Sequence, residues 1–237
     1  TDKIIFVSFD RFRDKVCEGE ACLICAKTKT DLTKEHIVPD WILRRFDLHD
    51  KAMHLPNGST IKYRRYVVPC CEDCNKLLGN KVEELVSAAF EAGIEGVRSL
   101  LERGGGPILF SWLCLLFFKI HFKDKSLLLN QDRRVGTGSI ADEHDYDWGE
   151  IHHLYCLARM PFTDVRVAPE ALGSLGVFSM KSGNLDREGF DLLDLTFAKT
   201  LGIRIGEVGL IGVFGDGGAV LYKLNQIFLQ RLRGQLT

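Results

Sequence analysis

The sequence lacks an excess of charge of either sign and any long uninterrupted apolar segment. Its 31 Lys and Arg residues are balanced by 32 Asp and Glu residues, so the net charge of −1 excludes the strongly basic class of nucleic-acid-binding proteins. Apolar and charged residues alternate from Thr1 to Asp14, where a secretory signal would have a continuous apolar core. The longest apolar run, Pro107–Phe122, is shorter than the roughly 20 residues of a membrane span and contains Lys119 and His121. We therefore expect a cytoplasmic protein without a membrane segment, in which this run forms a buried helix.

Disordered and fibrous classes are excluded as well, because 46% of the residues are hydrophobic and the mean hydropathy is −0.01. A chain of 237 residues with this composition can bury a substantial core and is long enough for two domains. The clearest breaker is the sequence GGGP at residues 104–107. We expect an α+β protein with one domain at residues 15–105 and a second, mixed helix and antiparallel-sheet domain at residues 106–237.

Short segments predict the elements of the N-terminal part. Residues 3–9 (KIIFVSF) have the composition of a strand. Pro39 favours the start of a helix, because the apolar residues after it recur at near-helical spacing. Residues 61–68 predict a strand that ends at Pro69, and the pattern that follows predicts a helix over residues 71–90.

The C-terminal part contains short β-forming segments at residues 176–180 and 201–205. The glycine-rich sequence GLIGVFGDGGAVLY, residues 209–222, predicts a β-hairpin with its turn at residues 216–217. A short helix is expected at residues 223–232. No catalytic pattern is visible here, and the sequence leaves the role of this part open, with an interface for a homo-oligomer or a partner protein as one alternative.

Eight cysteines without a secretory signal indicate a reducing compartment, where cysteines are more often metal ligands than disulfides. Four of them form two CxxC pairs, Cys22 with Cys25 and Cys71 with Cys74. Two residues between ligands allow a tight turn to aim both sulfurs at one ion, and two such pairs complete a closed tetrahedron. The spacing therefore predicts a structural zinc site, with Cys70 as a competing ligand and ordinary buried thiols as the alternative.

Three further residues would be drawn together by this zinc site. Glu35 and His36 follow the first CxxC pair, and Asn75 directly follows the last cysteine. The motifs CLIC, EHIVPDW and CEDCNKLLG resemble the HNH, or His-metal finger, nucleases with their ββα-metal fold. The resemblance is strongest to the zinc-containing branch that includes recombination endonuclease VII, and it covers roughly residues 20–85.

The resemblance implies a site for one catalytic divalent ion, Mg²⁺ or Mn²⁺. It makes Glu35 the carboxylate ligand, His36 the general base and Asn75 the amide ligand. In this family Asp is frequent at the position of Glu35, and His is frequent at the position of Asn75. Glu and Asn nevertheless each supply an oxygen ligand to a hard ion. A histidine base typically contributes roughly 10²–10⁴-fold to the rate. The alternatives are that His36 is a structural histidine whose hydrogen bonds are made within the protein, that Glu35 is an exposed charge, and that Asn75 caps a helix.

The same region contains candidates for nucleic-acid contact. Five basic residues are suited to phosphate binding: Arg44, Arg45, Lys62, Arg64 and Arg65. They are suited to contact the phosphate backbone of a nucleic acid, but their arrangement shows no pattern for recognising particular bases. The alternative is that they form an ordinary charged surface exposed to solvent. Asn57 is the candidate for the middle Asn of the HNH name, as a loop organiser or, beside Gly58, as a turn residue. Four histidines have no recognisable partner in the sequence: His49, His54, His121 and His144.

We therefore expect a metal-dependent DNA endonuclease that hydrolyses phosphodiester bonds to 5′-phosphate and 3′-hydroxyl ends. Small HNH proteins with an extra domain resemble effectors of bacterial restriction and anti-phage systems, which makes such a role the expected context. The alternative from another class is a zinc-stapled nucleic-acid- or protein-binding module that does not cut.

Overall fold

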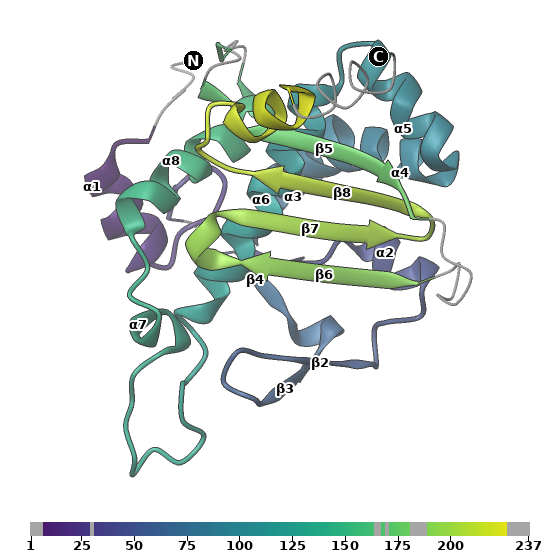
Figure 1. The fold of residues 1–237 in the computed structure, drawn as a ribbon. Helices are drawn as coiled ribbons and strands as arrows, with labels where there is room; N and C mark the ends of the chain where they lie inside the picture. The colour runs from purple at the N-terminus through teal and green to yellow at the C-terminus, as the bar shows by residue number, and fades with distance from the viewer. Residues whose placement is uncertain (1–6, 29–30, 164–166, 169–170, 181–188, 227–237) are drawn as a thin grey trace.

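The computed structural model describes residues 7–28, 31–163, 167–168, 171–180 and 189–226 (Figure 1). The α-helices are α1 (Phe9–Arg11), α2 (Asp40–Arg45), α3 (Glu72–Leu78), α4 (Glu84–Glu91), α5 (Gly93–Glu102), α6 (Gly106–Asp124), α7 (Ile140–Glu143) and α8 (Trp148–Ala158). The strands are β1 (Leu32–His36), β2 (Ala52–His54), β3 (Thr60–Lys62), β4 (Val67–Cys71), β5 (Ser174–Ser179), β6 (Phe190–Leu195), β7 (Thr200–Ile205) and β8 (Val208–Val213). This mixture of helices and antiparallel strands confirms the expected α+β class.

The first described segment is helical. Phe9 begins α1, and the Ser8 side chain caps this helix by accepting a hydrogen bond from the backbone N–H of Arg11. The π-helical segment η1 (Phe12–Cys17) follows and buries the side chains of Phe12 and Val16. The prediction of a strand over residues 3–9 is therefore wrong for residues 7–9, which are irregular and then helical. Residues 1–6 lie outside the described residues.

β1 and β4 form a two-stranded antiparallel sheet. Pro69 lies inside β4 opposite Lys34, so the expectation that this proline ends the strand is wrong. A strand without a second neighbour tolerates the missing N–H of proline, and the Pro69 carbonyl accepts a hydrogen bond from Leu23 N–H over 3.1 Å. The single strand expected over residues 61–68 is instead divided, because the 3-10 turn η2 (Tyr63–Arg65) separates β3 from β4.

The helix expected over residues 71–90 is confirmed, although it is not uniform. α3 continues through the π-helical segment η3 (Gly79–Glu83) into α4, and the chain turns after Ala92. Gly93 has a φ of 66°, a left-handed conformation that glycine adopts without steric cost. The predicted helix start after Pro39 is also confirmed, since α2 begins at Asp40.

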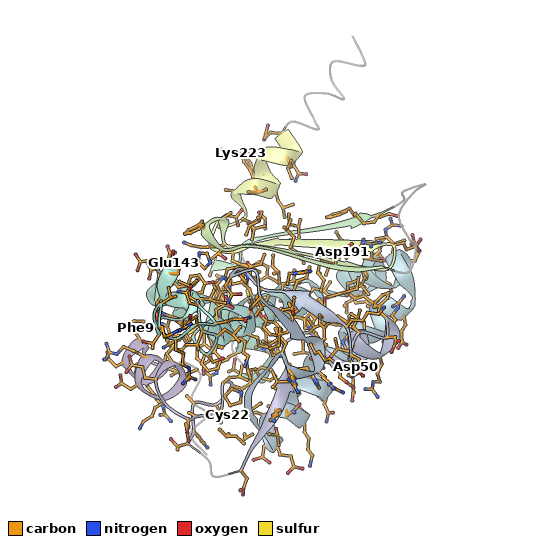
Figure 2. All side chains as sticks on the ribbon, turned by 90° about the horizontal axis from the view of Figure 1, so that it is seen from below. Phe9, Cys22, Asp50, Glu143, Asp191 and Lys223 are labelled. Atoms are coloured by element: carbon orange, nitrogen blue, oxygen red, sulfur yellow. The ribbon has the colours of Figure 1, made fainter. Side chains whose placement is uncertain are left out.

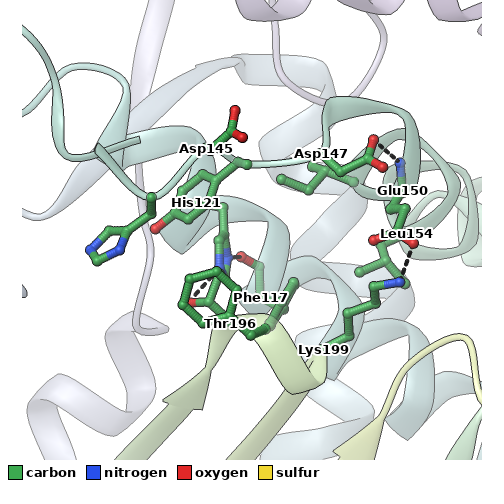
Figure 3. Close-up of a pocket in the computed structure, with 12 residues that line it drawn as sticks. Phe117, His121, Asp145, Asp147, Glu150, Leu154, Thr196 and Lys199 are labelled. Carbon is green, nitrogen blue, oxygen red and sulfur yellow. Dashed lines mark hydrogen bonds and ion pairs between the residues drawn. The ribbon is translucent and has the colours of Figure 1, made fainter. Parts of the chain in front are cut away.

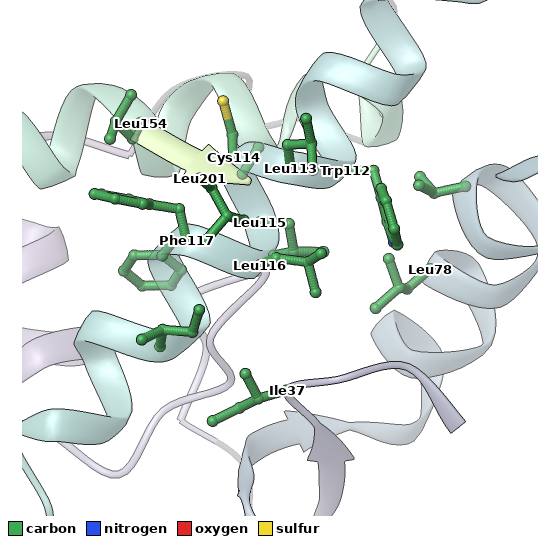
Figure 4. Packing of buried hydrophobic residues seen from close by; sticks show 14 of the residues in the cluster. Ile37, Leu78, Trp112, Leu113, Cys114, Leu115, Leu116, Phe117, Leu154 and Leu201 are labelled. Atoms are coloured by element: carbon green, nitrogen blue, oxygen red, sulfur yellow. The ribbon is translucent and has the colours of Figure 1, made fainter. Parts of the chain in front are cut away.

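α6 is the central helix of the core and confirms the buried helix expected from the apolar run. It has the length and composition to cross a membrane, but 72% of its apolar window is buried inside the protein. Ile37 after β1, Leu78 of α3, Leu154 of α8 and Leu201 of β7 all belong to the same buried cluster as the apolar residues of α6 (Figure 4). The described residues on both sides of residue 105 thus share one continuous hydrophobic core.

The four-stranded antiparallel sheet has the order β5-β8-β7-β6 and covers one side of the core (Figure 1). Cys22 lies on the side of the protein opposite to this sheet (Figure 2). The expected strands at residues 176–180 and 201–205 correspond to β5 and β7.

The hairpin turn expected at residues 216–217 is wrong. The hairpin joins β7 to β8 through Gly206, whose φ is 63°, and residues 219–226 are helical. The Asp216 carboxylate accepts hydrogen bonds from the backbone N–H groups of Ser174, Gly218 and Val220, so it caps this helix and does not lie in a hairpin turn between strands. The helix expected at residues 223–232 therefore begins earlier, and its part beyond residue 226 lies outside the described residues.

Candidate metal centre

Four cysteine sulfurs meet where the two CxxC pairs face one another. The Sγ atoms of Cys22, Cys25, Cys71 and Cys74 all lie within 4.8 Å of one another. Tetrahedral Zn–S bonds of about 2.3 Å separate the sulfurs by ~3.8 Å, so the cluster has nearly the dimensions of a four-thiolate zinc site. The structure brings together the cysteines that the spacing predicted, and this cluster could hold a structural metal such as zinc.

Backbone hydrogen bonds aim the sulfurs and join the two pairs. The chain turns after the first pair at Ala26, which has a φ of 54° and donates its N–H to the Cys22 carbonyl over 2.9 Å. Leu23 N–H binds the Pro69 carbonyl, which ties this turn to β4. Cys71 N–H then donates to Cys22 Sγ over 3.3 Å, directly across the cluster. Such a bond favours the charged thiolate, which is the form that binds metal.

Cys70 lies beside the cluster but is not one of the four mutually close sulfurs. Its Sγ is 3.9 Å from Cys22 Sγ and 3.5 Å from the Cys71 carbonyl oxygen. Hydrogen bonding to Cys22, together with burial, raises the pKa of the Cys70 thiol far above its usual value. The geometry therefore favours Cys71 over Cys70 as the third ligand.

The sulfur cluster fixes β1 next to α3. The strand register pairs Leu32 with Cys71 beside the cluster and His36 with Val67 at the other end of β1. α3 carries Asn75 and packs against both β1 and β4. The cluster thus joins the strand that contains Glu35 and His36 to the helix that contains Asn75.

A buried ion pair holds the end of β1. Lys119 of α6 donates from Nζ to Glu35 Oε1 over 2.5 Å and to the His36 carbonyl over 2.9 Å. The two side chains are 1% and 9% exposed, so Glu35 is not the exposed charge that the sequence allowed as an alternative. The signal that we missed was a single Lys inside an apolar helix, since a buried ammonium requires a partner.

His36 lies half-buried beside a second histidine that the sequence left without a partner. The rings of His36 and His49 meet edge to face with centroids 6.2 Å apart. His49 Nε2 lies 2.9 Å from Asp40 Oδ1, and Asp40 also pairs with Arg44. Within the described part of the chain, the His36 side chain has no hydrogen bond, so its ring nitrogens remain open to solvent or to a bound molecule.

Asn75 does not cap α3, because the N-cap position belongs to Cys71. It is half-buried in the first turns of the helix, and no hydrogen bond to another described residue occupies its amide. Asn57 lies in the loop between β2 and β3, where its Nδ2 donates to the carbonyls of Leu128 and Leu129 and its Oδ1 accepts from Ser59 N–H. Asn57 therefore organises a loop and also lies inside a turn, since Gly58 N–H donates to the Leu55 carbonyl over 2.9 Å.

Most of the predicted phosphate-binding residues have protein partners. Arg44 pairs with Asp40, and both Lys62 and Arg64 pair with Asp50. The hydrogen bond from Lys62 holds the pKa of the Asp50 carboxyl below its usual value. Arg45 donates to the Phe90 carbonyl over 3.2 Å, whereas Arg65 is exposed. These five residues share one region, but acidic neighbours neutralise part of their charge.

A cavity of about 140 Å³ lies away from the cysteines, between α6, the connection from α7 to α8 and the turn from β6 to β7 (Figure 3). Its lining includes Tyr146, which stacks on His144, and the ion pair between Lys199 and Glu150. His121, another histidine without a recognisable partner in the sequence, is fully buried here. This cavity was invisible in the sequence because its walls come from distant segments.

Two carboxyl groups lie close to this cavity, Asp124, which is buried, and Asp194, which is partly buried. Burial, together with the nearby Asp124 carboxyl, raises the pKa of Asp194 to about 7, and burial raises that of Asp124 to about 6. Burial lowers the pKa of His121 to about 4, so at neutral pH the neutral ring donates to the Phe117 carbonyl and does not pair with a carboxylate. The Oδ1 atoms of both aspartates are buried without a hydrogen bond among the described residues.

No family model, curated protein or solved structure matches this chain.

We expect the purified protein to contain one zinc ion per chain, measured by inductively coupled plasma mass spectrometry. Cys71→Ser should lose the zinc and lower the melting temperature, because metal binding contributes directly to folding. Cys70→Ser should keep the zinc, and Cys156→Ser on α8 serves as a control for a distant thiol. Zinc-free wild-type protein, or zinc loss in Cys70→Ser with retention in Cys71→Ser, would contradict this assignment.

We expect the contribution of Asp194 to the free energy of unfolding to fall as the pH rises from about 4 to about 7. The folded pKa of Asp194 lies above its unfolded value of about 3.9, so the folded state binds more protons in this window. Asp194→Asn should flatten the fall and stabilise the protein at pH 8 by roughly 1–2 kcal/mol.

Urea titrations at several pH values would measure this effect, with Glu143→Gln at an exposed site as the control. An unchanged pH slope in Asp194→Asn would show that Asp194 is not the group responsible.

Proposed function

We propose that this protein is a metal-dependent DNA endonuclease of the HNH type. The observation that carries the proposal is the four-cysteine cluster, which holds β1, with Glu35 and His36, against α3, with Asn75. In chain order, β1, β4 and α3 give two antiparallel strands and a helix, which we interpret as the ββα-metal unit.

Glu35 and Asn75 are the residues that would hold the catalytic ion, Mg²⁺ or Mn²⁺. Their carboxylate and amide oxygens are hard donors of the kind that these ions prefer. Glu35 Oε1 is occupied by Lys119, whereas Oε2 has no partner among the described residues. When bound, such an ion stabilises negative charge on the phosphate and the leaving oxygen. The donor chemistry therefore fits the group, with one Glu35 oxygen left for it.

His36 is suited to remove a proton from the attacking water. Its ring is half-buried and makes no hydrogen bond within the described residues, so a nitrogen is available as a base. The edge-to-face contact with His49 restricts the ring, and Asp40 in turn holds His49. Lys119 fixes the backbone at His36 by binding its carbonyl. These contacts orient the imidazole without consuming its proton-accepting atom.

DNA would be bound through its phosphates. The basic residues of α2 and of the segment around η2 lie in the same N-terminal region as His36, and Arg65 is exposed. Phosphate binding would require Lys62 and Arg64 to exchange Asp50 for the nucleic acid, since both now contact this carboxylate. Such contacts give affinity without sequence preference.

One observation favours a second function, a zinc-stapled binding module that does not cut. The pair between Glu35 and Lys119 is buried and well formed, so the carboxylate is already neutralised. A carboxylate in this state is a weaker ligand for a divalent ion than a free one, because the ammonium competes for it. The two functions differ in whether DNA is cleaved or only bound.

We expect the zinc-loaded protein to nick supercoiled plasmid DNA in the presence of Mg²⁺ or Mn²⁺ but not of EDTA. His36→Ala should reduce the cleavage rate by roughly 10²-fold or more, because the general base is removed. His54→Ala is the matched control, since this histidine is exposed on β2, and it should cleave as the wild type does.

Zinc content and circular dichroism of each variant establish that the fold is intact. Full cleavage by His36→Ala would rule out His36 as the base. Wild-type protein that binds DNA without nicking it under any of these conditions would favour the binding module.

A further inference from the structure

The outer face of the four-stranded sheet is apolar and exposed. Leu201 and Ile203 of β7 belong to the buried core, so the residues that alternate with them point away from it. The strand register extends this outer face to the neighbouring strands, where it includes Leu193 and Leu195 of β6 and Phe178 of β5. All three side chains are exposed, Leu193 by 55%, so the described part of the chain does not cover them.

A groove of about 220 Å³ crosses this outer face. Two glycines form its floor, because Gly202 lies opposite Leu193 and Gly209 lies in register with Phe178. A Cβ at Gly209 would lie 2.4 Å from the Phe178 ring, so this ring rests directly on the glycine backbone. Glycines in a strand allow another chain to approach the sheet closely.

The outer face has no excess of charge. Asp191 and Arg204 are the charged residues at its outward positions in the described strands, and they form an ion pair with each other. A neutral face does not attract nucleic acid or an anionic membrane electrostatically. An exposed apolar patch of this kind is typical of protein–protein interfaces, and two copies of it can meet without like-charge repulsion.

The helix of residues 219–226 presents a second apolar surface. Ser174 Oγ accepts a hydrogen bond from Leu221 N–H over 3.1 Å, which anchors the first turn of this helix to β5. The helix then stands off the sheet (Figure 2), and the side chains of Tyr222 and Leu224 are exposed, the latter by 56%. A helix this short is marginal in water unless its apolar side chains pack against another surface.

The sheet face and the helix together have the area of a dimer interface. Four strands of six residues span roughly 20 Å by 19 Å, which gives a footprint of roughly 400 Å². Two such faces and two helices would bury on the order of 1,000 Å² or more, the size at which specific interfaces begin.

We propose that this outer face is the interface of a homodimer, in which the helix of residues 219–226 of each copy packs on the sheet of the other. In a dimer with two-fold symmetry every contact occurs twice, so one chain supplies both the helix and the sheet face. Each sheet would then be covered by helices on both faces. Cys22 lies on the opposite side of the protein (Figure 2), so both candidate metal centres remain accessible. The inference does not depend on the proposed endonuclease function.

Size-exclusion chromatography with light scattering tests the dimer on the zinc-loaded full chain. At ~100 µM, which would saturate a micromolar dimer, we expect twice the chain mass of 26.7 kDa. Leu193→Lys and Leu224→Lys should each shift the mass to that of one chain, because a lysine in the interface would be buried without a partner. Leu85→Lys on α4 is the matched control, since this leucine is also exposed, and it should remain a dimer.

The melting temperature of each variant establishes that the fold is intact. Hydrogen exchange of the wild type provides a readout without substitution, and residues 219–226 should exchange more slowly at high than at low protein concentration. A monomeric wild type would overturn the inference, whether the face is covered by residues 227–237 of the same chain or binds anionic lipid vesicles. A dimer that survives both Leu193→Lys and Leu224→Lys, or exchange independent of concentration, would also contradict it.

Discussion

The close approach of four cysteine sulfurs is the constraint on which the candidate site depends. Two of them precede β1, one ends β4 and one lies in α3, so the cluster holds three elements whose residues are far apart in the sequence. The β1–β4 pair has only two strands, and such a sheet is marginal without further support. A metal in the cluster would provide that support, because binding to preformed thiolates adds its free energy to folding. The positions of Glu35, His36 and Asn75 follow from this arrangement.

A second constraint comes from α6, which supplies the apolar core and one buried charge. Lys119 crosses from this helix to Glu35 and the His36 carbonyl, so the end of β1 is held by a residue far along the chain. A buried ion pair contributes little net stability, but the loss of one partner leaves an uncompensated charge. Lys119 therefore couples the integrity of the core to the geometry of the candidate site.

The sequence predicted the parts of the structure that local patterns determine. The α+β class, the helix after Pro39 and the long buried helix of residues 107–122 followed from periodicity and are confirmed. The four-cysteine cluster followed from spacing, because two CxxC pairs suit one ion. The roles of Glu35, His36 and Asn75 stay predictions, since their chemistry depends on an ion and a substrate.

The remaining features depend on contacts between distant segments, which no local pattern contains. The partners of Lys119 lie in β1, far from α6 in the sequence. The predicted hairpin turn failed because Asp216 binds Ser174 in another strand and caps a helix. Anomalous diffraction from Mn²⁺-soaked crystals, at the zinc and manganese edges, tests the account most directly. We expect one zinc peak among the four cysteine sulfurs and one manganese peak beside Glu35 and Asn75. A zinc peak elsewhere, or manganese bound away from these residues, would contradict it.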